Sequence, residues 1–296
     1  MEVTYASLYK FVDRNIKRTN GEKTLLETKD GMGIEFPGYR LSPCELEEGE
    51  FATLFLDMRG STTRTRDYGR KIAAVTLHAF LPTLAHIVKS LNGFVVDYPG
   101  DGIMAHWEED GQDPGGAIVN ATIAAGWMDD AVKNIVNPLL LENQIPTIQF
   151  GIGIAMGTVT ITNLGIPGAY AHKAIGDSVN WASKLANNKE HFGAILIDDL
   201  SSAKGFIPVS PTQIPLASIQ FNTVIIDGRQ VRKITEMAYY KLPRPTPEDS
   251  TLEEKAKRSN LVSTLSTLGR LVPSHQRGLI PNYQPLGLLG PLQPNR

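Results

Sequence analysis

The sequence predicts an α+β fold, and two features of its patterning lead to that prediction. Segments with helical periodicity alternate with short apolar runs of strand length along most of the chain. Several of the short runs are joined by tight-turn signals, which indicate antiparallel hairpins. A purely parallel, doubly wound sheet would place a helix between successive strands, so the hairpins favour the α+β class.

Four segments are expected to be helical, the first from the spacing of Leu8, Phe11, Val12 and Ile16 along one face. The helical segments are residues 4–17, about 61–92, 115–142 and 178–188. Pro82 lies within the second segment and is expected to kink or divide it, because proline lacks a backbone N–H and its ring clashes with the preceding turn.

Apolar runs bounded by polar or turn-forming residues predict the strands. These runs are residues 51–56, 94–96, 103–107, 149–156, 194–197, 219–226 and 231–240. Gly157 is expected to close the fourth strand, with residues 159–161 pairing back on it. Asp227-Gly228 is expected to form the tight turn of a hairpin between the last two strands.

The composition is that of a globular protein with little bulk charge. The chain has 296 residues, 42% of them hydrophobic, and a net charge of −2, which implies no general attraction to nucleic acid or to a membrane. The sequence contains no run of about 18 apolar residues, so a membrane span is not expected. The N-terminus shows no signal-peptide pattern. Cys44 is the single cysteine, so an internal disulfide is excluded. A cytoplasmic location is the resulting expectation.

The strongest local signal is the segment 55–62, Phe-Leu-Asp-Met-Arg-Gly-Ser-Thr. Asp57 stands at the end of a buried strand, and Gly60, Ser61 and Thr62 then begin a helix. A helix N-terminus exposes backbone N–H groups that can bind a phosphate, and the adjacent carboxylate can hold the divalent cation of a triphosphate. An ordinary strand-end aspartate followed by a serine cap explains the segment about equally well.

A second signal is the turn at residues 98–102, Tyr-Pro-Gly-Asp-Gly. By itself it is best explained as a hairpin turn, because Asp-Gly is favoured there for backbone reasons. If the strands that carry Asp57 and Asp101 are neighbours in one sheet, however, the two carboxylates converge. Two carboxylates that bridge two metal ions suit in-line phosphoryl chemistry.

A third motif, Gly-Asp-Ser-Val-Asn-Trp-Ala-Ser-Lys-Leu, occupies residues 176–185. Asn180 and Lys184 are four positions apart, so they share one face of the predicted helix. An amide and a cation on that face can orient a ribose and stabilise the charge that develops on a phosphate. A capped amphipathic helix with a solvated lysine is the simpler interpretation of this motif alone.

In this order and spacing the three motifs resemble the catalytic domain of class III adenylate/guanylate cyclases, over roughly residues 50–240. The resemblance implies a mixed, mostly antiparallel sheet flanked by helices, in a dimer whose active sites lie at the interface. It places the catalytic domain at 46–242. An N-terminal segment with a helix and short strands, 1–45, would precede it, and a linker with a C-terminal extension, 243–296, would follow.

The resemblance also implies roles for individual residues. One chain would supply Asp57 and Asp101 as ligands of two divalent cations, Mn²⁺ or Mg²⁺, with the Met58 carbonyl as a further ligand. The partner chain would supply the residues that read the base, together with Asn180. Lys184 stands where the family usually has arginine, so the charge is kept but the bidentate fork is lost. The product would be a cyclic nucleoside 3′,5′-monophosphate plus pyrophosphate.

The base-reading positions depart from the adenylate cyclase pattern, which has lysine at the first and aspartate or threonine at the second. They hold Asp97, four residues before Asp101, and Lys173, seven before Asn180. Asp97 would repel the acceptor nitrogen of adenine, whereas uracil, guanine and cytosine each offer groups that an aspartate–lysine pair satisfies. The exchange of charges between positions 97 and 173 therefore argues against ATP as the substrate and leaves UTP, CTP and GTP as candidates.

Tyr98 stands where many family members carry a small threonine, and its bulk favours a pyrimidine, although a strand residue packing on the sheet is the simpler interpretation. This feature resembles the pyrimidine cyclases of bacterial Pycsar anti-phage systems. The favoured function is conversion of UTP to cyclic UMP by a homodimer with shared active sites. In that setting a downstream effector would be activated by the cyclic nucleotide.

Several alternatives stay open or are rejected at this point. Cytidylate or guanylate cyclase activity stays open, and so does a catalytically silent cyclase-like module that binds nucleotide and regulates a partner. Gly151-Ile152-Gly153 begins a dinucleotide-binding fingerprint, but Gly157 falls one residue late for its third glycine, so we reject that interpretation.

Overall fold

The computed structural model describes residues 3–20, 46–109, 115–166, 169–191, 193–198 and 219–236. Residues 21–45 of the expected N-terminal segment and the linker and extension expected at 243–296 lie outside these described residues. The division of the chain into segments 1–45, 46–242 and 243–296 therefore stays a prediction.

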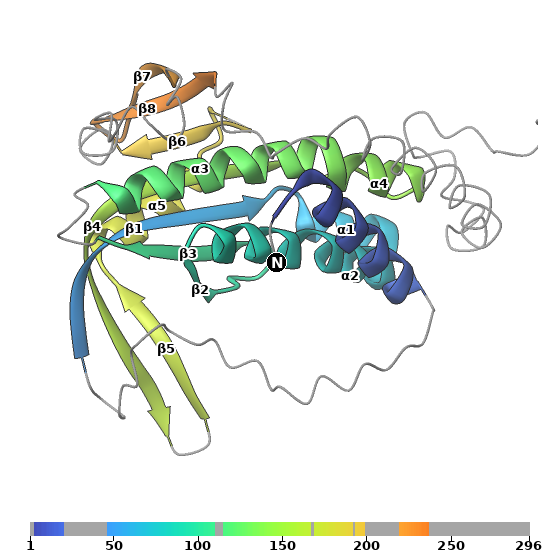
Figure 1. Cartoon of the computed structure of the whole chain (residues 1–296), viewed down its shortest axis with the longest axis horizontal. Coiled ribbons are helices and arrows are strands. Elements are labelled where there is room, and N and C mark those ends of the chain that lie inside the picture. Colours follow the sequence, from blue (N-terminus) through green and yellow to red (C-terminus); the bar gives the residue numbers. More distant parts are fainter. Residues whose placement is uncertain are drawn as a thin grey trace, which may run out of the picture.

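One sheet of eight strands organises the described residues (Figure 1). Its order is β2-β3-β1-β4-β6-β8-β7, and β5 pairs with β4 outside this path. Among the described strands, β4 and β6 are parallel and all other neighbours are antiparallel, so the predicted mixed, mostly antiparallel sheet is confirmed. The strands are β1 (Leu46–Met58), β2 (Phe94–Asp97), β3 (Ile103–Glu108), β4 (Phe150–Ile166), β5 (Ala169–Ile175), β6 (Ile195–Asp198), β7 (Gln220–Ile226) and β8 (Arg229–Glu236).

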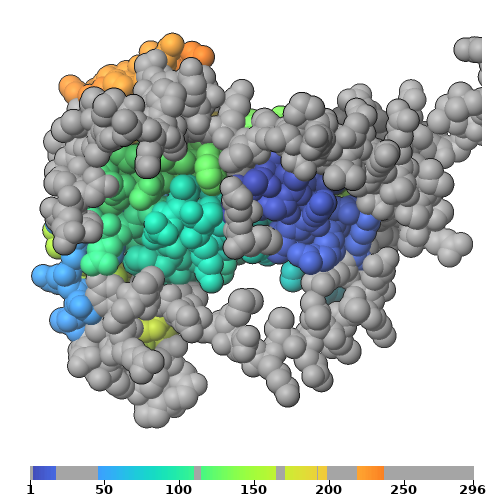
Figure 2. Space-filling view, in the orientation of Figure 1, coloured from blue at the N-terminus to red at the C-terminus, as the bar shows by residue number. Residues whose placement is uncertain are grey.

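All four predicted helical segments are helical. The helices are α1 (Tyr5–Asn20), α2 (Ser61–Ser90), α3 (Gly116–Ala131), α4 (Asn137–Glu142) and α5 (Asp177–Ala186), with a π-helical turn, η1 (Val132–Val136), between α3 and α4. The apolar side of α1 packs into the core, and in the space-filling view α1, in dark blue, lies beside the teal segments that follow β1 in the chain (Figure 2). The predicted Asp227-Gly228 turn is also present, with both residues at positive φ, 48° and 78°.

β1 lies in the middle of the sheet, and its residues 51–56 are buried on both faces, as their apolar run predicts. Leu54 and Leu56 belong to the larger core, to which α1, α2 and α3 contribute. Phe51 and Phe55 belong to a smaller core that includes the apolar side chains of α5. Because successive side chains alternate between the two faces of a strand, Asp57 lies on the α5 face.

The break in α2 differs from the one predicted. The non-helical residue is Gly69 (φ 85°, ψ 163°), and Pro82 lies inside the helix, so the division expected at Pro82 is wrong. Pro82 has no N–H to donate to the carbonyl of His78, one turn earlier. The side-chain amide of Asn15 in α1 donates to that carbonyl at 3.2 Å, which satisfies the acceptor that the proline leaves free.

α2 is also long and apolar enough to cross a bilayer, judged by length and composition alone. Its buried side chains, among them Phe80 and Leu84, pack into the larger core. A core helix of this length meets the same two criteria, so α2 is weak evidence for a membrane span.

β4 is one strand of 17 residues, and the expected fold-back at Gly157 is wrong. Gly157 pairs with Phe51 inside a continuous β1–β4 ladder, and a Cβ added to Gly157 would lie 3.3 Å from Cβ of Ser178 in α5. The glycine therefore marks a close approach of α5 rather than a strand end. The strand that pairs back is β5, which no sequence pattern predicted; it pairs with residues 160–166 of β4 and forms an arm with them (Figure 1). The start of β1 pairs with the other edge of β4 as far as Thr162.

His106 of β3 is a fully buried polar residue in the smaller core. Its Nδ1 lies 2.9 Å from the hydroxyl of Thr53, and its ring lies against those of Phe51 and Phe94. Burial lowers the pKa of His106 from 6.5 to about 3, because the imidazolium ion would lose its hydration there.

The free energy of unfolding is therefore expected to fall below about pH 6.5, because the unfolded chain then binds a proton that the folded chain excludes. The stability that the folded chain has with His106 neutral is complete above pH 6.5. As the pH falls toward the folded-state pKa of about 3, it is lost by at most ~1.4 kcal/mol per pH unit. Urea unfolding between pH 7 and pH 4.5 measures this slope. The His106→Gln variant should lack that part of it, and identical slopes in both proteins would refute the assignment.

Candidate active site

The structure brings Asp57 and Asp101 together at one end of β1. β1 pairs with β3 through Leu56 and Ile103, so the β2–β3 turn lies beside the strand end that carries Asp57. Gly102 allows this approach, since a Cβ there would lie 2.6 Å from the Leu56 carbonyl oxygen and 3.2 Å from Oδ1 of Asp57. The two carboxylates are neighbours, as the sheet pairing requires.

The electrostatic environment of the Asp57 and Asp101 carboxylates favours a bound cation. Burial raises the pKa of Asp57, the charge of Asp101 raises it further, and Arg59 opposes both. Oδ2 of Asp101 is buried and has no hydrogen-bond partner in the described part of the chain. A buried, unpaired carboxylate oxygen beside a second carboxylate is the oxygen-rich environment that Mg²⁺ or Mn²⁺ binds.

The protein ligands offered here are few. The described ranges contain no group of three or more His, Cys, Asp or Glu side chains that could hold a metal ion. Beyond the two aspartates, a cation would need main-chain or water oxygens, and Met58 follows Asp57 directly, with its side chain buried in the larger core. The metal roles of Asp57, Met58 and Asp101 stay predictions.

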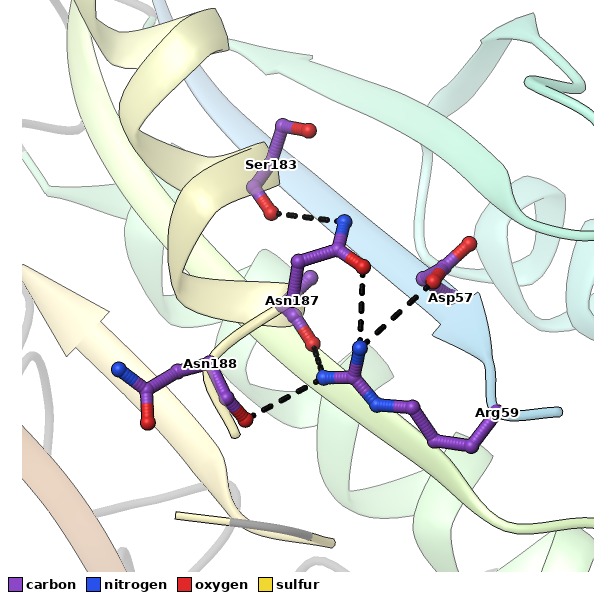
Figure 3. Close-up of polar contacts among 6 residues, drawn as sticks. Asp57, Arg59, Ser183, Asn187 and Asn188 are labelled. Atoms are coloured by element: carbon purple, nitrogen blue, oxygen red, sulfur yellow. Dashed lines mark hydrogen bonds and ion pairs between the residues drawn. The ribbon is translucent and has the colours of Figure 1, made fainter. Parts of the chain in front are cut away.

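Arg59 links this strand end to the C-terminus of α5 (Figure 3). Its Nη1 lies 3.8 Å from Oδ2 of Asp57 and donates to Oδ1 of Asn187 at 3.0 Å. Its Nη2 donates to the carbonyl oxygens of Ala186 and Asn188. Sequence reasoning missed Arg59, although it stands only two positions after Asp57, in the turn that follows β1.

The N-terminus of α2 begins directly after this strand end. Gly60 precedes the helix in the left-handed conformation (φ 71°), and no side chain caps the first turn. Ser61 is half-buried and Thr62 is exposed. The N-cap residue therefore supplies no side-chain acceptor to the first-turn N–H groups, which is compatible with the phosphate site predicted at Gly60, Ser61 and Thr62.

Asp97 and Lys173 lie together, on the neighbouring ends of β2 and β5. Lys173 Nζ is 3.4 Å from Oδ2 of Asp97, whose Oδ1 accepts the backbone N–H of Tyr98 at 2.8 Å. The side chains of Lys173 and Asp97 are 50% and 40% exposed, and Tyr98 is 40% exposed. Because it is this exposed, the ion pair adds little to the stability of the fold. The same exposure makes all three side chains accessible to a ligand.

Asn180 and Lys184 are both exposed on α5. Lys184 Nζ lies 2.5 Å from Oδ2 of Asp227 in the β7–β8 turn. The Arg229 guanidinium of the same hairpin stacks 4.6 Å from the ring centroid of Trp181. Sequence reasoning missed these hairpin contacts, because no local pattern relates residues more than 40 positions apart.

The tight fit of α5 on the sheet explains the Gly151-Ile152-Gly153 pattern. A Cβ added to Gly153 would collide with the carbonyl oxygen of Ala182, and one added to Gly151 would collide with that of Ala186. The two glycines therefore let the α5 backbone lie directly on β4. This packing role agrees with the rejection of a dinucleotide-binding fingerprint.

No protein-family model matches the chain. It is 26% identical over 144 residues to an adenylate cyclase from Anabaena cylindrica, covering 49% of this chain and 28% of that protein. It is 24% identical over 168 residues to a uridylate cyclase from Rhodovulum sp. (strain MB263), covering 55% of this chain and 68% of that protein. The chain thus spans little more than a quarter of the Anabaena relative.

A solved structure shows the same arrangement of elements. The adenylyl cyclase CyaB from P. aeruginosa superposes with a TM-score of 0.55 at 19% identity, over 66% of this chain and 98% of that one. At this identity the likeness establishes the fold and leaves the substrate undetermined. The sheet order, the three motifs and the relatives agree, and the chain has the fold of the class III nucleotidyl cyclase catalytic domains.

Proposed function

We propose that the chain is a nucleotidyl cyclase that converts UTP to 3′,5′-cyclic UMP and pyrophosphate. The observation that carries this proposal is the pair Asp57 and Asp101 at the end of β1. Burial and mutual repulsion raise the pKa of Asp57, and one oxygen of Asp101 is buried without a partner. A metal site would compensate both features, whereas a purely structural pair would leave them as a cost to folding.

In the proposed reaction the ribose 3′-oxygen attacks the α-phosphorus, the bond to the β,γ-pyrophosphate breaks, and the 3′-hydroxyl proton is lost. Asp57 and Asp101 would hold two divalent cations, which when bound supply Lewis-acid activation and neutralise the triphosphate. The first-turn N–H groups of α2, from Gly60 to Thr62, would bind phosphate oxygens. Asn180 would orient the ribose, and Lys184 would place positive charge near the α-phosphate.

Lys184 Nζ forms an ion pair with Oδ2 of Asp227 at 2.5 Å. Both side chains are more than half exposed, so water screens the pair and its contribution to stability is small. A triphosphate carries several negative charges and would compete effectively with one exposed carboxylate. The contact is therefore compatible with a catalytic lysine that turns to its substrate on binding.

Asp97 and Lys173 support a base other than adenine. Their side chains meet at 3.4 Å and are exposed, so they offer an acceptor and a donor side by side. Uracil presents an imide N–H beside carbonyl oxygens, which matches that pair, and the exposed ring of Tyr98 would limit the space to a pyrimidine. Similarity to a uridylate cyclase supports the same choice. The proposed relation to antiviral signalling rests only on the resemblance of the Tyr98 position to the Pycsar pyrimidine cyclases.

The direct test incubates the protein with each of the four nucleoside triphosphates and Mn²⁺ and identifies the products. We expect cyclic UMP as the main product. Asp57→Ala and Asp101→Ala should each reduce the rate by at least ~10³-fold, because each removes a carboxylate from the metal site. Conversion of ATP alone would refute the base assignment. Nucleotide binding without any turnover would favour the silent regulatory module.

The shared-site dimer is tested by mixing two inactive variants. Asp101→Ala removes a carboxylate from one half of a site, and Asn180→Ala removes the ribose contact from the other half. If the halves come from different chains, a mixed dimer contains one intact site, so the mixture should regain activity that neither variant has alone. Absence of any rescue, with dimers confirmed by sedimentation, would refute shared sites.

Base reading is tested by exchanging the charges in the double variant Asp97→Lys/Lys173→Asp. This restores the pattern of adenylate cyclases, so the ratio of ATP to UTP turnover should rise by at least ~10-fold, because each base then meets the opposite set of donors and acceptors. The matched control is Asp13→Lys/Lys17→Asp, which reverses an ion pair on α1. An unchanged ratio in the first variant would contradict the assignment.

A further inference from the structure

We propose that Arg59 is a positioning residue that joins the carboxylate of Asp57 to the C-terminal turn of α5. It would thereby couple the two sets of catalytic groups that one chain carries. The inference rests on the proposed function, because it assumes that Asp57 and the α5 residues act in cyclisation. It adds a residue to which no motif assigns a role.

The guanidinium of Arg59 is held from two sides. On the strand side its backbone N–H donates to the carbonyl of Gln149 at 2.7 Å, which fixes the start of the side chain. On the helix side it reaches Ala186, Asn187 and Asn188, where the last turn of α5 leaves carbonyl groups without intrahelical donors. A cation at a helix C-terminus is also favoured by the helix dipole.

A glycine keeps the space for this guanidinium. Gly151 pairs with Asp57 in the β1–β4 ladder. A Cβ added there would lie 2.8 Å from Nη2 of Arg59 and would collide with the carbonyl oxygen of Ala186. The opening between strand and helix is therefore just large enough for the planar group, and the Arg59 side chain is only 17% exposed within it.

The contact also orients the carboxylate of Asp57. Oδ2 faces Arg59, with Nη1 at 3.8 Å, while Oδ1 faces the β2–β3 turn, 3.2 Å from the Cβ position of Gly102. Arg59 thus lies at ion-pair distance from one oxygen, and the other oxygen is directed toward the turn that carries Asp101. Such orientation of a ligand by a neighbouring group is how supporting residues tune metal sites.

The position of Arg59 affects groups of two active sites in the proposed dimer. Asn180 and Lys184 lie on α5, whose last turn Arg59 holds, whereas Asp57 lies on the strand end. In the proposed dimer these two sets serve different active sites. Arg59 would then stand between the metal half of one site and the ribose half of the other, so its loss should damage both halves that its own chain supplies.

The test mixes Arg59→Met chains with chains that carry either Asp101→Ala or Asn180→Ala. We expect each mixture to regain less than about a tenth of the activity of the Asp101→Ala/Asn180→Ala mixture, because Arg59→Met impairs both halves. Rescue by the Asn180→Ala chain would mean that Arg59 acts only through Asp57. Rescue by the Asp101→Ala chain would mean that it acts only through α5. Either rescue overturns the coupling.

A second measurement needs neither metal nor substrate. Amide hydrogen exchange of the metal-free protein should be at least ~5-fold faster at residues 185–188 in Arg59→Met, because the last turn of α5 loses its anchor. Arg66→Met is the matched control, since Arg66 is an exposed arginine of α2 paired with Asp67, and it should leave this exchange unchanged. Unchanged exchange in Arg59→Met would overturn the inference.

Kinetics separate positioning from general loss of structure. With thermal unfolding showing that the variants are folded, Arg59→Met should lower kcat by ~100-fold or more, because both halves of each site are then impaired, and should leave KM within about threefold, because misplaced groups slow the reaction more than binding. Arg59→Lys keeps a charge near Asp57 and should recover part of kcat; a kcat equal to that of Arg59→Met contradicts the role of that charge. If the Asp101→Ala/Asn180→Ala mixture shows no rescue, the shared-site proposal fails, and the exchange measurement still decides whether Arg59 anchors α5.

Discussion

The fixed register of β1 at the centre of the sheet is the constraint on which both fold and site depend. β1 pairs with β3 on one side and with β4 on the other, and its two faces contribute to two separate cores. A shift of one residue would move Phe51 and Phe55 into the wrong core, so the register cannot slip without a large loss of apolar burial. The same register sets Asp57 at the strand end, on the face covered by α5.

Glycines then decide what can approach that strand end. Gly102 lets the β2–β3 turn lie against Asp57, and Gly151 and Gly153 let α5 lie against β4. Substitution at any of these positions would displace backbone rather than a flexible side chain, because the nearest atoms include main-chain carbonyl oxygens. The site is therefore assembled by close backbone packing, and its charged side chains occupy the space that the glycines leave.

Local patterns predicted most elements, and the errors have physical causes. Gly157 was expected to end a strand, but a ladder with β1 and the approach of Ser178 in α5 hold it within β4. Pro82 was expected to break α2, but Asn15 of another helix satisfies the carbonyl that proline leaves free. β5 lacks an apolar run, because its exposed side chains alternate along an arm with little core to cover. In each case a tertiary contact overrides the local signal.

In the candidate site, too, local patterns predicted some features, and others depend on tertiary contacts. The neighbourhood of Asp57 and Asp101 could be predicted on one condition, since Asp57 follows a recognisable strand and Asp101 lies in a recognisable hairpin turn. The condition was that the strands carrying them are neighbours, and the β1–β3 pairing meets it. The contacts of Lys184 with Asp227 and of Arg59 with the end of α5 were not, because they join residues far apart in sequence. Such contacts depend on the completed packing of α5 on one face of the sheet, where it meets both β4 and the β7–β8 hairpin.

The central claim is that Asp57 and Asp101 form a two-metal site completed by a second chain. Anomalous diffraction from crystals grown with Mn²⁺ and a non-hydrolysable UTP analogue tests it most directly. The account predicts two manganese peaks between Asp57 and Asp101 of one chain, with the uracil contacting Asp97 and Lys173 of the other. Manganese bound elsewhere, or a nucleotide held by one chain alone, would contradict it.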